Sequence, residues 1–596
     1  MCGIIGYAGK DDAVEVLEYG LKTLEYRGYD SAGICIYDGE KFVTTKKAGT
    51  VDNLFKYINK IQKSDIGIGH TRWATHGKAT DVNSHPHSGS FGKVTVVHNG
   101  IIENYKEIAK KHLAGITLKS ETDTEVISNL IEKFYVLYGE KISAICCAIK
   151  EIKGSFALAI IFDDDSENIY FAKRFSPLNI GIGCDANFLS SDVLGFNKYT
   201  KKYFELPDDS VGKISRLKIS VFDKEKNVLH LKEKTIPQDR LESGKSGYPN
   251  FMIKEINEIP KIIMDTASFY QKNRILQKVK QDFWSDIKRI KLIACGTSYH
   301  ACLIGEKLLC DEGYDANAYI ASEFIYANPI LNKHTLCIFV SQSGETADTL
   351  SAIKIAREKG SKTLAITNVS TSTITKMCDY ILPIKCGAEI AVASTKAYNG
   401  QLVAFFALTS FLSKETKVYK QTLKELKQVA KAIDIEDIKL QIKPLIKAVI
   451  NAKNVFMVGR QTDYVTSLES SLKLKEITYK NCQGYASGEL KHGTISLIDN
   501  DSLVFAYITD KELASKTMNV IKQTQSRGAK ICVISPFDEI INDETINYKI
   551  KLPKIKFTYY PIVSILPMQL ISYYVSTTLG INPDKPRNLA KSVTVE

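Results

Sequence analysis

The sequence has little that points to secretion, to disulfide bonding or to a membrane. Its 13 cysteines are odd in number and none are spaced as C-x-x-C, so we expect reduced thiols. The first residues carry Asp11 and Asp12 in place of a basic segment, which is not typical of a signal peptide. The most apolar stretch, YYPIVSILPMQLISYYV, is interrupted by two prolines and Gln569, and it predicts a buried helix instead of a membrane span. We therefore expect a soluble, cytoplasmic protein with no membrane partner.

A concentrated basic segment is also missing. The 596 residues carry a net charge of +12, but the lysines are spread along the chain without a basic tail or an RNP-type aromatic motif. The excess suits anionic ligands such as sugar phosphates, and no nucleic-acid partner is expected.

The organisation of the chain changes near residue 240. Before it, the strand candidates GIIGY, SAGICIY, VTVVHNG and GSFALAIIF alternate with helical runs near residues 12–26 and 123–138, which predicts a mixed α+β domain. The polar segment QDRLESGKSGYPN, residues 238–250, is typical of a linker.

Beyond this segment, helix-length stretches separate the apolar runs KLIAC, TLCIFV, TLAIT, NVFMV, SLVFAYI and KICVIS. Runs this apolar predict strands buried on both faces, and hence doubly wound parallel sheets. KLIACGTSYHACLIGEKL and NVFMVGRQTDYVTSLESSL share an order of strand, polar turn and helix. We therefore expect two copies of one α/β fold, near residues 285–430 and 448–580.

The chain begins MCGIIGYAG, with a thiol at the second position. If Met1 is removed, Cys2 carries a free α-amine that can take the thiol proton, and the thiolate becomes a nucleophile. Gly3 lets the backbone approach a substrate. For this dipeptide alone, a chance cysteine is the alternative.

Three later stretches, HTRWATHG, HNGIIENY and SETDTEVI, supply complementary groups. Arg72 offers a planar fork for a carboxylate, and Asp123 can hold an amine. Asn99 and Gly100 offer N–H donors for an oxyanion. Each group has a plain alternative, namely an ion pair for Arg72, a hairpin turn for Asn99–Gly100 and a helix cap for Asp123.

Histidines are concentrated in the same region, with five of the ten between His70 and His98. Imidazole is a common zinc ligand, but no cysteine or carboxylate pattern completes a ligand set. We therefore expect no metal.

Together, CGIIGYAG, LEYRGYDSAGI, HTRWATHG, NSHPH, HNGIIENY and SETDTEVI make about the first 240 residues similar to the N-terminal-nucleophile glutamine amidotransferases. The resemblance implies a four-layer αββα domain that hydrolyses glutamine to glutamate and ammonia. It implies that Cys2 attacks the amide carbon and that Asn99 and Gly100 stabilise the oxyanion. The glutamine-binding residues that it implies are Arg27, Arg72, Trp73, Thr75, His76 and Asp123.

The loop SQSGET lies between the apolar run TLCIFV and a helical segment, and CGTS lies at the equivalent place after KLIA. Hydroxyls and free N–H groups at a helix N-terminus favour an anion, although ordinary Ser/Thr capping is the alternative for either loop. ACGTS, SQSGET and AVASTKAY resemble sugar isomerase domains, which bind phosphosugars. The sugar-phosphate-binding residues expected on this basis are Thr297, Ser298, Ser341, Gln342, Ser343, Thr346, Val392 and Ser394.

Three further segments carry reactive side chains. Lys473 and Glu476 lie three residues apart in SLKLKEITY, on one helix face, and a surface ion pair is the plain alternative. His492 lies in QGYASGELKHG, and Lys591 lies in PRNLAKSVTVE, near an end that usually frays. These segments are similar to the C-terminal half of the glutamine–fructose-6-phosphate aminotransferase family, in its bacterial form without a long insertion.

That resemblance implies that L-glutamine and D-fructose 6-phosphate give D-glucosamine 6-phosphate and L-glutamate. It implies ring opening assisted by His492, a Schiff base on Lys591, and a proton transfer between C2 and C1 by Glu476 with help from Lys473. It also implies an internal ammonia channel gated by Trp73, no cofactor, and a homodimer in which His492 reaches the partner's site.

The expected domains are an amidotransferase domain at 2–240, a linker and connecting helix at 241–284, sugar isomerase domains at 285–430 and 448–580, and a catalytic tail at 581–596. Two other functions stay open. An amidotransferase with another acceptor, such as an amidophosphoribosyltransferase, would show a ribose-phosphate diphosphate loop in place of SQSGET. A phosphosugar-binding regulator would need neither Lys591 nor Glu476.

Overall fold

The computed structural model describes residues 2–58, 63–74, 77–236, 244–413 and 416–593. They divide into two compact units, which adjoin in the sequence between residues 243 and 244. Lys591 still belongs to the second unit, and Ser592 and Val593 are grouped with the first.

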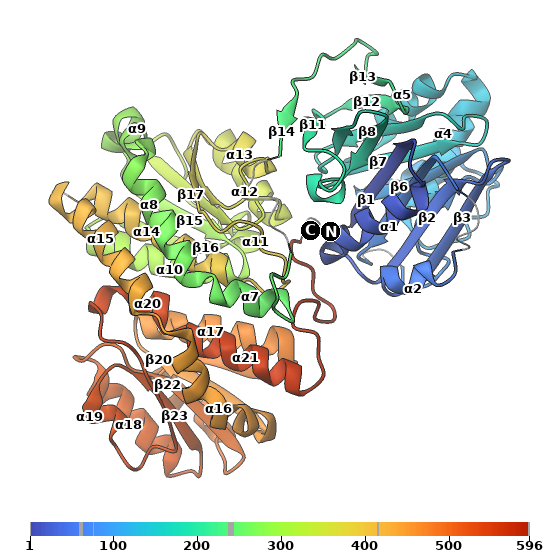
Figure 1. Ribbon diagram of the computed structural model, residues 1–596. Helices are drawn as coiled ribbons and strands as arrows, with labels where there is room; N and C mark the ends of the chain where they lie inside the picture. Colours follow the sequence, from blue (N-terminus) through green and yellow to red (C-terminus); the bar gives the residue numbers. More distant parts are fainter. Residues whose placement is uncertain (1, 59–62, 75–76, 237–243, 414–415, 594–596) are drawn as a thin grey trace. The chain divides into compact units, whose positions relative to one another are not determined.

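The first unit contains two antiparallel sheets (Figure 1). In sheet order, the larger one consists of β14 (Lys234–Thr235), β11 (Lys202–Glu205), β9 (Asn179–Ile182), β10 (Ala186–Ser190), β1 (Gly3–Gly9), β4 (Ile66–Arg72), β2 (Ser31–Tyr37) and β3 (Phe42–Ala48). The smaller one consists of β13 (Ile219–Asp223), β12 (Ser210–Ile214), β8 (Ile169–Arg174), β7 (Gly154–Phe162), β6 (Val94–Ile102) and β5 (His87–Ser88).

The two sheets pack face to face through the apolar side chains on one face of each. Ile4 and Ala8 of β1 join Ala157 of β7 in an apolar layer between the sheets, whereas Ile5 and Tyr7 point to the opposite face. The helices that cover the two outer faces are α1 (Ala13–Leu24) and α2 (Val51–Phe55) on the larger sheet, and α3 (Tyr105–His112), α4 (Asp123–Tyr138) and α5 (Lys141–Glu151) on the smaller one. The first unit therefore has four layers in the order αββα.

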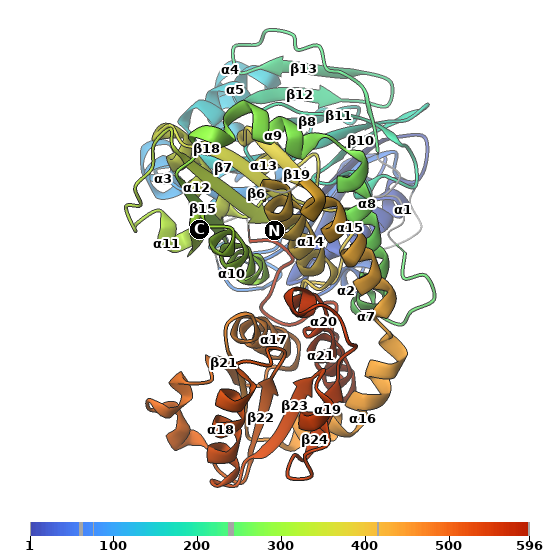
Figure 2. The same cartoon turned by 90° about the vertical axis from the view of Figure 1, so that its left-hand side faces the viewer.

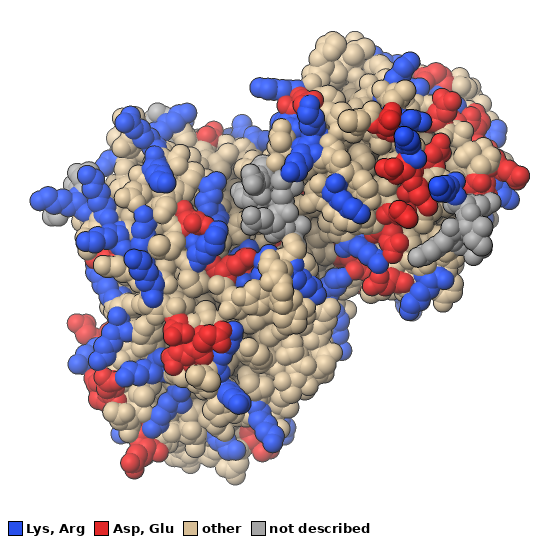
Figure 3. All heavy atoms as spheres, in the orientation of Figure 1, with Lys and Arg blue, Asp and Glu red and all other residues tan. Residues whose placement is uncertain are grey.

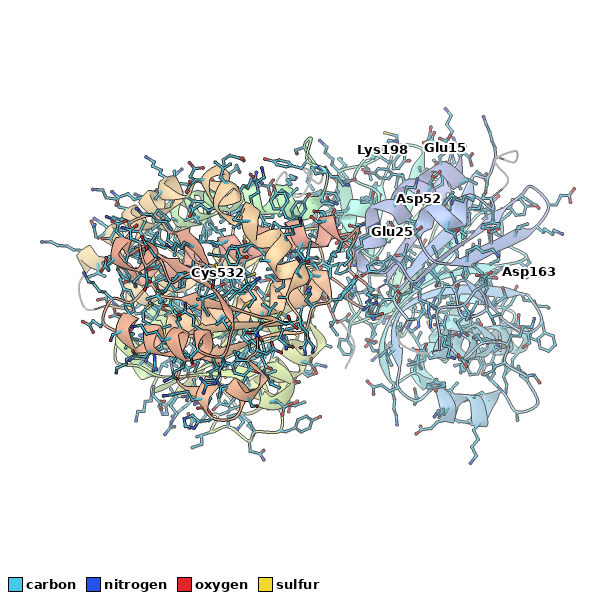
Figure 4. The ribbon with its side chains drawn as sticks, turned by 90° about the horizontal axis from the view of Figure 1, so that it is seen from below. Glu15, Glu25, Asp52, Asp163, Lys198 and Cys532 are labelled. Atoms are coloured by element: carbon cyan, nitrogen blue, oxygen red, sulfur yellow. The ribbon has the colours of Figure 1, made fainter. Side chains whose placement is uncertain are left out.

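The turn that follows α1 is tied to α2 by a buried carboxylate, Glu25 (Figure 4). Its Oε1 accepts a hydrogen bond from the Val51 N–H at the start of α2, at 2.8 Å. Lys22 adds an ion pair to Asp52 at 2.8 Å. These contacts hold the short helix η1 (Glu25–Arg27), which carries Arg27.

The second unit contains two parallel five-stranded sheets of identical order. In sheet order, the first consists of β16 (Asp315–Ile320), β15 (Arg289–Ala294), β17 (Thr335–Ser341), β18 (Lys362–Thr367) and β19 (Tyr380–Pro383). The second consists of β21 (Cys482–Ala486), β20 (Asn454–Gly459), β22 (Ser502–Tyr507), β23 (Lys530–Ser535) and β24 (Tyr548–Lys551). The same strand order in both makes them two copies of one topology.

One apolar core joins the inner faces of both parallel sheets, and in Figure 2 α17, α20 and α21 lie together beside the second sheet. The helices around it are α7 (Phe251–Asn257), α8 (Ile259–Lys272), α9 (Ile275–Phe283), α10 (Gly296–Asp311), α14 (Lys396–Leu412), α15 (Thr416–Ala432), α16 (Ile435–Asn451), α17 (Thr462–Thr478), α20 (Tyr560–Val563) and α21 (Leu566–Thr578). The outer faces carry α11 (Ala321–Phe324), α12 (Ala347–Glu358) and α13 (Thr373–Met377) on the first sheet, and α18 (Ala514–Gln525) and α19 (Asp538–Ile541) on the second. Helices on both faces make each sheet doubly wound.

The predicted fold class is confirmed in both units. The apolar stretch at 559–575 forms α20 and most of α21, whose side chains are buried in the core. No helix in the described ranges is long and apolar enough to cross a membrane. Residues 251–283, expected within a linker and connecting helix, form α7, α8 and α9, because side chains such as Met252 and Ile263 join the same core.

The basic charge is dispersed over the face of the molecule drawn in Figure 3. Lysine and arginine side chains are scattered there, with acidic side chains among them. On this face, the net charge of +12 therefore does not gather into one stripe.

Candidate active sites

Cys2 immediately precedes β1 and lies beside the end of β4. Its Sγ accepts a hydrogen bond from the Trp73 N–H at 3.2 Å, and its carbonyl oxygen accepts one from Asn99 Nδ2 at 2.9 Å. Burial raises the pKa of the Cys2 thiol, while the Trp73 N–H and the Arg72 guanidinium act in the opposite direction. The thiol therefore needs a base before it can act as a nucleophile.

Asn99 and Gly100 are consecutive residues inside the strand β6, so the alternative of a hairpin turn is wrong. Gly100 has a φ of +132°, and a Cβ there would lie 2.0 Å from the Ser155 carbonyl oxygen, so the position requires glycine. The Asn99 side chain lies between Cys2 and His70, whose Nε2 is 3.0 Å from Asn99 Oδ1. The structure thus brings a predicted oxyanion donor to the thiol-bearing residue.

The two charged residues predicted to bind the glutamine backbone are both buried. Arg72 ends β4, and its guanidinium donates to the carbonyl oxygens of Gly77 and Lys78 at 3.3 and 3.4 Å. Asp123 is the first residue of α4, and its Oδ2 accepts the Ile102 N–H at 2.9 Å. The residue before it is the N-cap, so Asp123 does not serve as the helix cap.

Arg27 contacts the two residues that follow β10. Its Nη1 donates to the Ser191 carbonyl oxygen at 3.1 Å and forms an ion pair with Asp192 at 3.3 Å. Tyr26 donates to the same Asp192 carboxylate at 3.0 Å. Arg27 therefore holds the turn that follows β10.

The remaining predicted glutamine-binding residues follow Arg72. Trp73 packs edge-on against Tyr29, with ring centroids 5.8 Å apart, and the residue after it donates its N–H to Asp30 at 2.9 Å. Thr75 and His76 lie outside the described residues.

Four buried histidines, His70, His85, His87 and His98, form a cluster that contacts Asn99 through His70. The rings of His70 and His85 are stacked with centroids 4.1 Å apart, and His85 Nδ1 accepts the His98 N–H at 3.2 Å. Burial lowers the pKa of His70 to about 3 and those of His85 and His87 well below their usual value. In the part of the chain that the structure describes, no group of His, Cys, Asp and Glu has the arrangement of a metal site.

In the second unit, Lys473 and Glu476 extend from α17 into a buried polar cluster. Lys473 Nζ is 2.7 Å from Glu476 and 3.5 Å from Glu469, and it donates to Thr297 Oγ1 at 3.0 Å. Glu469 also contacts His300 Nδ1 at 2.7 Å. Lys473 is 0% exposed, so the alternative of a surface ion pair is wrong. Although burial lowers the pKa of Lys473, the carboxylates of Glu476 and Glu469 raise it above its usual value.

The hydroxyls of the CGTS loop are engaged inside this unit. Thr297 bridges Lys473 and Glu469, and Ser298 Oγ accepts from Gln401 Nε2 at 2.9 Å. The N-cap of α10 is Cys295, so neither hydroxyl caps the helix.

The SQSGET loop is closed by its own residues. Ser341 Oγ accepts the Gly344 N–H at 3.0 Å and lies 3.2 Å from Thr346 Oγ1. Gly344 has a φ of +68°, and a Cβ there would lie 2.1 Å from Ser372 Oγ. Thr346 is the N-cap of α12, yet its side chain makes no capping bond, so ordinary capping does not explain this loop. The same loop contains Gln342 and Ser343.

Lys591 is buried beside the loop AVASTKAY. Its Nζ lies 2.5 Å from Glu389 Oε2, which also accepts the Ser394 hydroxyl at 2.8 Å. Glu389 Oε1 accepts the N–H groups of Thr395 and Ala397, both at 3.0 Å. Burial alone raises the pKa of Glu389, but Lys591 and these donors lower it to about 2. The Lys591 side chain is 4% exposed, so this lysine is held inside the unit.

A second carboxyl group, Glu255 of α7, contacts the same loop. Its Oε1 accepts the N–H groups of Ile390 and Ala391 at 2.5 and 3.3 Å. Burial, and then the charge of Glu389, raise the pKa of Glu255 to about 8. The pKa values of the two carboxyl groups are therefore shifted in opposite directions, and a proton on this pair is held by Glu255 in preference to Glu389.

Asp584 anchors the segment that leads to Lys591. Its carboxylate accepts the N–H groups of Phe251 and Met252 at 2.8 Å each, at the start of α7. Its carbonyl oxygen accepts the Val392 N–H at 3.1 Å. One residue thus joins the end of the unit to α7 and to the loop that carries Val392.

His492, the remaining predicted catalytic residue, lies on the surface of the second unit. It follows the short helix η4 (Glu489–Lys491) and is exposed. Among the described residues, no hydrogen bond or ion pair joins its ring to Lys473, Glu476 or Lys591.

The sequence-based prediction omitted the two carboxylates that hold the predicted lysines. Glu469 lies four residues before Lys473 on one helix face, and that spacing was the available signal. Glu389 lies just before AVASTKAY, but no local pattern connects it with Lys591.

The two copies of the parallel sheet carry different residues at the start of the helix that follows the first strand. Thr297 and Asp463 are each the second residue of the helix that follows the first strand of their copy. Asp463 accepts the N–H and the hydroxyl of Thr509 at 2.8 and 2.6 Å. Thr509 lies two residues after β22, as Ser343 lies two residues after β17. In the second copy, an internal carboxylate therefore binds the loop that corresponds to SQSGET.

Comparison with protein families finds two domain types. A glutamine amidotransferase domain matches residues 70–193, and a SIS domain matches residues 284–410 and 448–579. The two SIS-domain ranges each contain one copy of the parallel sheet.

Curated relatives align over the whole chain. The glutamine–fructose-6-phosphate aminotransferase (isomerizing) of Clostridium tetani is 41% identical over 100% of both chains. Proteins of the same name from Staphylococcus aureus strain N315 and Halalkalibacterium halodurans are 40% and 39% identical, again over 100% of both chains.

Solved structures match the second unit. The C-terminal domain of glucosamine-fructose-6-phosphate aminotransferase from Francisella tularensis is 30% identical, with a TM-score of 0.54, over 58% of this chain and 100% of that chain. Tagatose-6-phosphate ketose/aldose isomerase from Escherichia coli, 17% identical with a TM-score of 0.50 over 57% of this chain and 97% of that chain, shares the fold. With full-length relatives at about 40% identity, the chain belongs to the glutamine–fructose-6-phosphate aminotransferase family.

Proposed function

We propose that the protein converts L-glutamine and D-fructose 6-phosphate into L-glutamate and D-glucosamine 6-phosphate. The observation that carries the proposal is the 41% identity, over the whole of both chains, with a relative of that name. The contact between Cys2 and Asn99 in the first unit and the buried lysines of the second unit support it.

In the first unit, removal of Met1 gives Cys2 a free α-amine as the base for its thiol. The thiolate adds to the side-chain amide carbon of glutamine, and the carbonyl oxygen takes the electron pair. Asn99 Nδ2 and the Gly100 N–H stabilise this oxyanion. The C–N bond then breaks as the nitrogen takes a proton and leaves as ammonia, and water hydrolyses the thioester to glutamate.

Glutamine is held by its charged ends. Arg72 binds the α-carboxylate and Asp123 the α-amine, each from a buried position that strengthens the interaction. Arg27 supports the site through its ion pair with Asp192. The other groups proposed to surround glutamine are Trp73, Thr75 and His76.

In the second unit, the SQSGET loop and the N-terminus of α12 bind the phosphate group. The CGTS loop, Val392 and Ser394 complete the sugar site.

After ring opening, the amine of Lys591 adds to the C2 ketone and loses water to form a Schiff base, from which ammonia displaces the lysine. Glu476 then moves a proton between C1 and C2, with help from Lys473.

Ammonia has to reach the sugar as the neutral molecule, since ammonium is not a nucleophile. We therefore include in the proposal a path shielded from water, with Trp73 as its gate. A homodimer in the cytoplasm completes the proposal, because the exposed His492 can then serve the partner's sugar site for ring opening.

The test is to incubate the purified full chain with L-glutamine and D-fructose 6-phosphate and to identify the products by mass spectrometry. Equal amounts of glutamate and glucosamine 6-phosphate are expected. Glutamate with a different amino sugar would identify another acceptor, and sugar binding without glutamate release would identify a regulator. Cys2→Ala is expected to abolish both products while calorimetry still detects fructose 6-phosphate binding.

A further inference from the structure

We propose that His70 is a positioning residue for glutamine hydrolysis, which orients the Asn99 amide so that an N–H, and not the oxygen, is presented to the oxyanion. The inference rests on the proposed hydrolysis of glutamine by Cys2.

His70 connects the two sheets of the first unit at the reactive end of β1. It lies on β4 of the larger sheet, is 0% exposed, and places Nε2 between two oxygens of β6. The distances are 2.9 Å to the His98 carbonyl oxygen and 3.0 Å to Asn99 Oδ1. Since a carbonyl oxygen only accepts, Nε2 carries the hydrogen of the ring.

The contact of the Asn99 amide with Cys2 supports the same orientation of the amide. The Cys2 carbonyl oxygen, 2.9 Å away, needs a donor, and Nδ2 supplies it. A flipped amide would place its oxygen against the Cys2 carbonyl and its hydrogens against the N–H of His70. Both ends of the amide therefore favour one orientation.

This orientation suits the chemistry proposed for Cys2. One Nδ2 hydrogen is bonded to the Cys2 carbonyl, which leaves the second for the oxyanion that forms on the glutamine carbonyl oxygen when the adjacent thiolate adds to the amide. The stacked ring of His85, nearly parallel at 9°, restricts the tilt of the His70 ring. The His70 ring bonds to the His98 carbonyl oxygen and to Asn99, so we infer that it acts through Asn99.

The test uses the full chain with its leading methionine removed and measures glutamate release in the presence of fructose 6-phosphate. His70→Leu is expected to lower kcat roughly 10- to 100-fold, less than the 10²- to 10³-fold expected of Asn99→Ala. The KM for glutamine is expected to stay within twofold. His70→Gln, whose amide N–H can replace Nε2–H, is expected to recover most of kcat.

Two measurements separate positioning from a general structural effect. Alkylation of Cys2 by iodoacetamide forms no oxyanion, so its rate is expected to be the same in His70→Leu and in the unaltered chain. Adding His70→Leu to Asn99→Ala is expected to cause no further loss, because the two residues act through one amide. His112→Leu, which removes an imidazole contact to Glu151 elsewhere in the unit, is expected to keep full activity.

A parallel fall of alkylation and hydrolysis in His70→Leu, or multiplying losses in the double variant, would overturn the role of His70. Absence of glutamate release from the unaltered chain would instead overturn the proposed function itself. If His70→Leu does not fold, failure of His70→Gln to exceed the rate of Asn99→Ala overturns the role of His70.

Discussion

The side chains of Lys591 and Glu389 form a buried ion pair although 202 residues separate them in the sequence. Ser394 shares the same carboxylate oxygen, so the amine of Lys591 is fixed beside a residue predicted to bind sugar phosphate. A lysine held in this way loses little freedom when it reacts.

Replacement of Lys591 by methionine is expected to stop amino-sugar formation and to leave glutamine hydrolysis measurable. It also leaves Glu389 buried without its cation, which lowers the free energy of unfolding by about 3–5 kcal/mol. The double variant Lys591→Met/Glu389→Gln is expected to recover much of this stability but no synthesis. Thermal unfolding and product chromatography check both points, and product from either variant would exclude a Schiff base on Lys591.

Glu476→Gln is expected to lower kcat for glucosamine 6-phosphate by two to four orders of magnitude, the usual contribution of a general base. Glu436→Gln is a matched control, because the exposed Glu436 forms an ion pair with Lys439 at the same spacing of three residues. The control is expected to keep full activity. Equal rates for the two variants would remove Glu476 from the proton transfer.

Gly344→Ala is expected to weaken fructose 6-phosphate binding at least tenfold and to leave glutamine hydrolysis intact. The new Cβ would lie 2.1 Å from Ser372 Oγ and would open the loop. Gly360→Ala is the control, since Gly360 has a similar φ of +76° but no atom within 4 Å of the added Cβ. Calorimetric titration with the sugar phosphate compares the two, and equal affinities would show that the loop does not bind it.

Mild acid is expected to destabilise the first unit. His70, His85 and His87 have lowered pKa values when folded, to about 3 for His70, because burial disfavours their charge. The unfolded histidines bind protons near pH 6.5, so the unfolded state is the one that gains protons as the pH falls. The stabilisation is therefore complete above about pH 6.5 and is lost below it, by up to about 1.4 kcal/mol per histidine per pH unit.

Tryptophan fluorescence can follow this unit alone. The chain has two tryptophans, and Trp284→Phe leaves Trp73 of the first unit as the reporter. Denaturant unfolding at pH 7.5, 6.5 and 5.5 is expected to show midpoints that fall with pH. The unfolding midpoint should depend less steeply on pH in His87→Gln. A midpoint of the unaltered chain that does not change with pH would contradict the prediction.

Local patterns in the sequence were sufficient for the fold class. The strand candidate GIIGY lies in β1 (Gly3–Gly9), and the helical run near 123–138 coincides with α4 (Asp123–Tyr138). The apolar run KLIA and its equivalents became strands buried on both faces. These features depend on neighbours within a few residues.

Contacts between distant segments were not predictable in this way. Nothing near Arg27 points to Asp192, and nothing near Lys591 points to Glu389. Lys473 and Glu476 were found by helix spacing, but their burial depends on the packing of α17 against α10, which brings Thr297 to them. Sequence patterns identify the chemical groups, and tertiary packing decides which of them meet.

The carboxyl group of Asp463 binds the loop of the second copy that corresponds to SQSGET, the loop proposed to bind the phosphate in the first copy. We therefore expect one phosphate-binding site for the two copies of the fold. Calorimetric titration with fructose 6-phosphate should saturate at one equivalent per polypeptide. The second copy instead carries Lys473 and Glu476 on α17, and Lys473 reaches Thr297 of the first copy. In the proposed mechanism, the first copy therefore binds the phosphate of the sugar, and the second copy supplies the residues that move its protons.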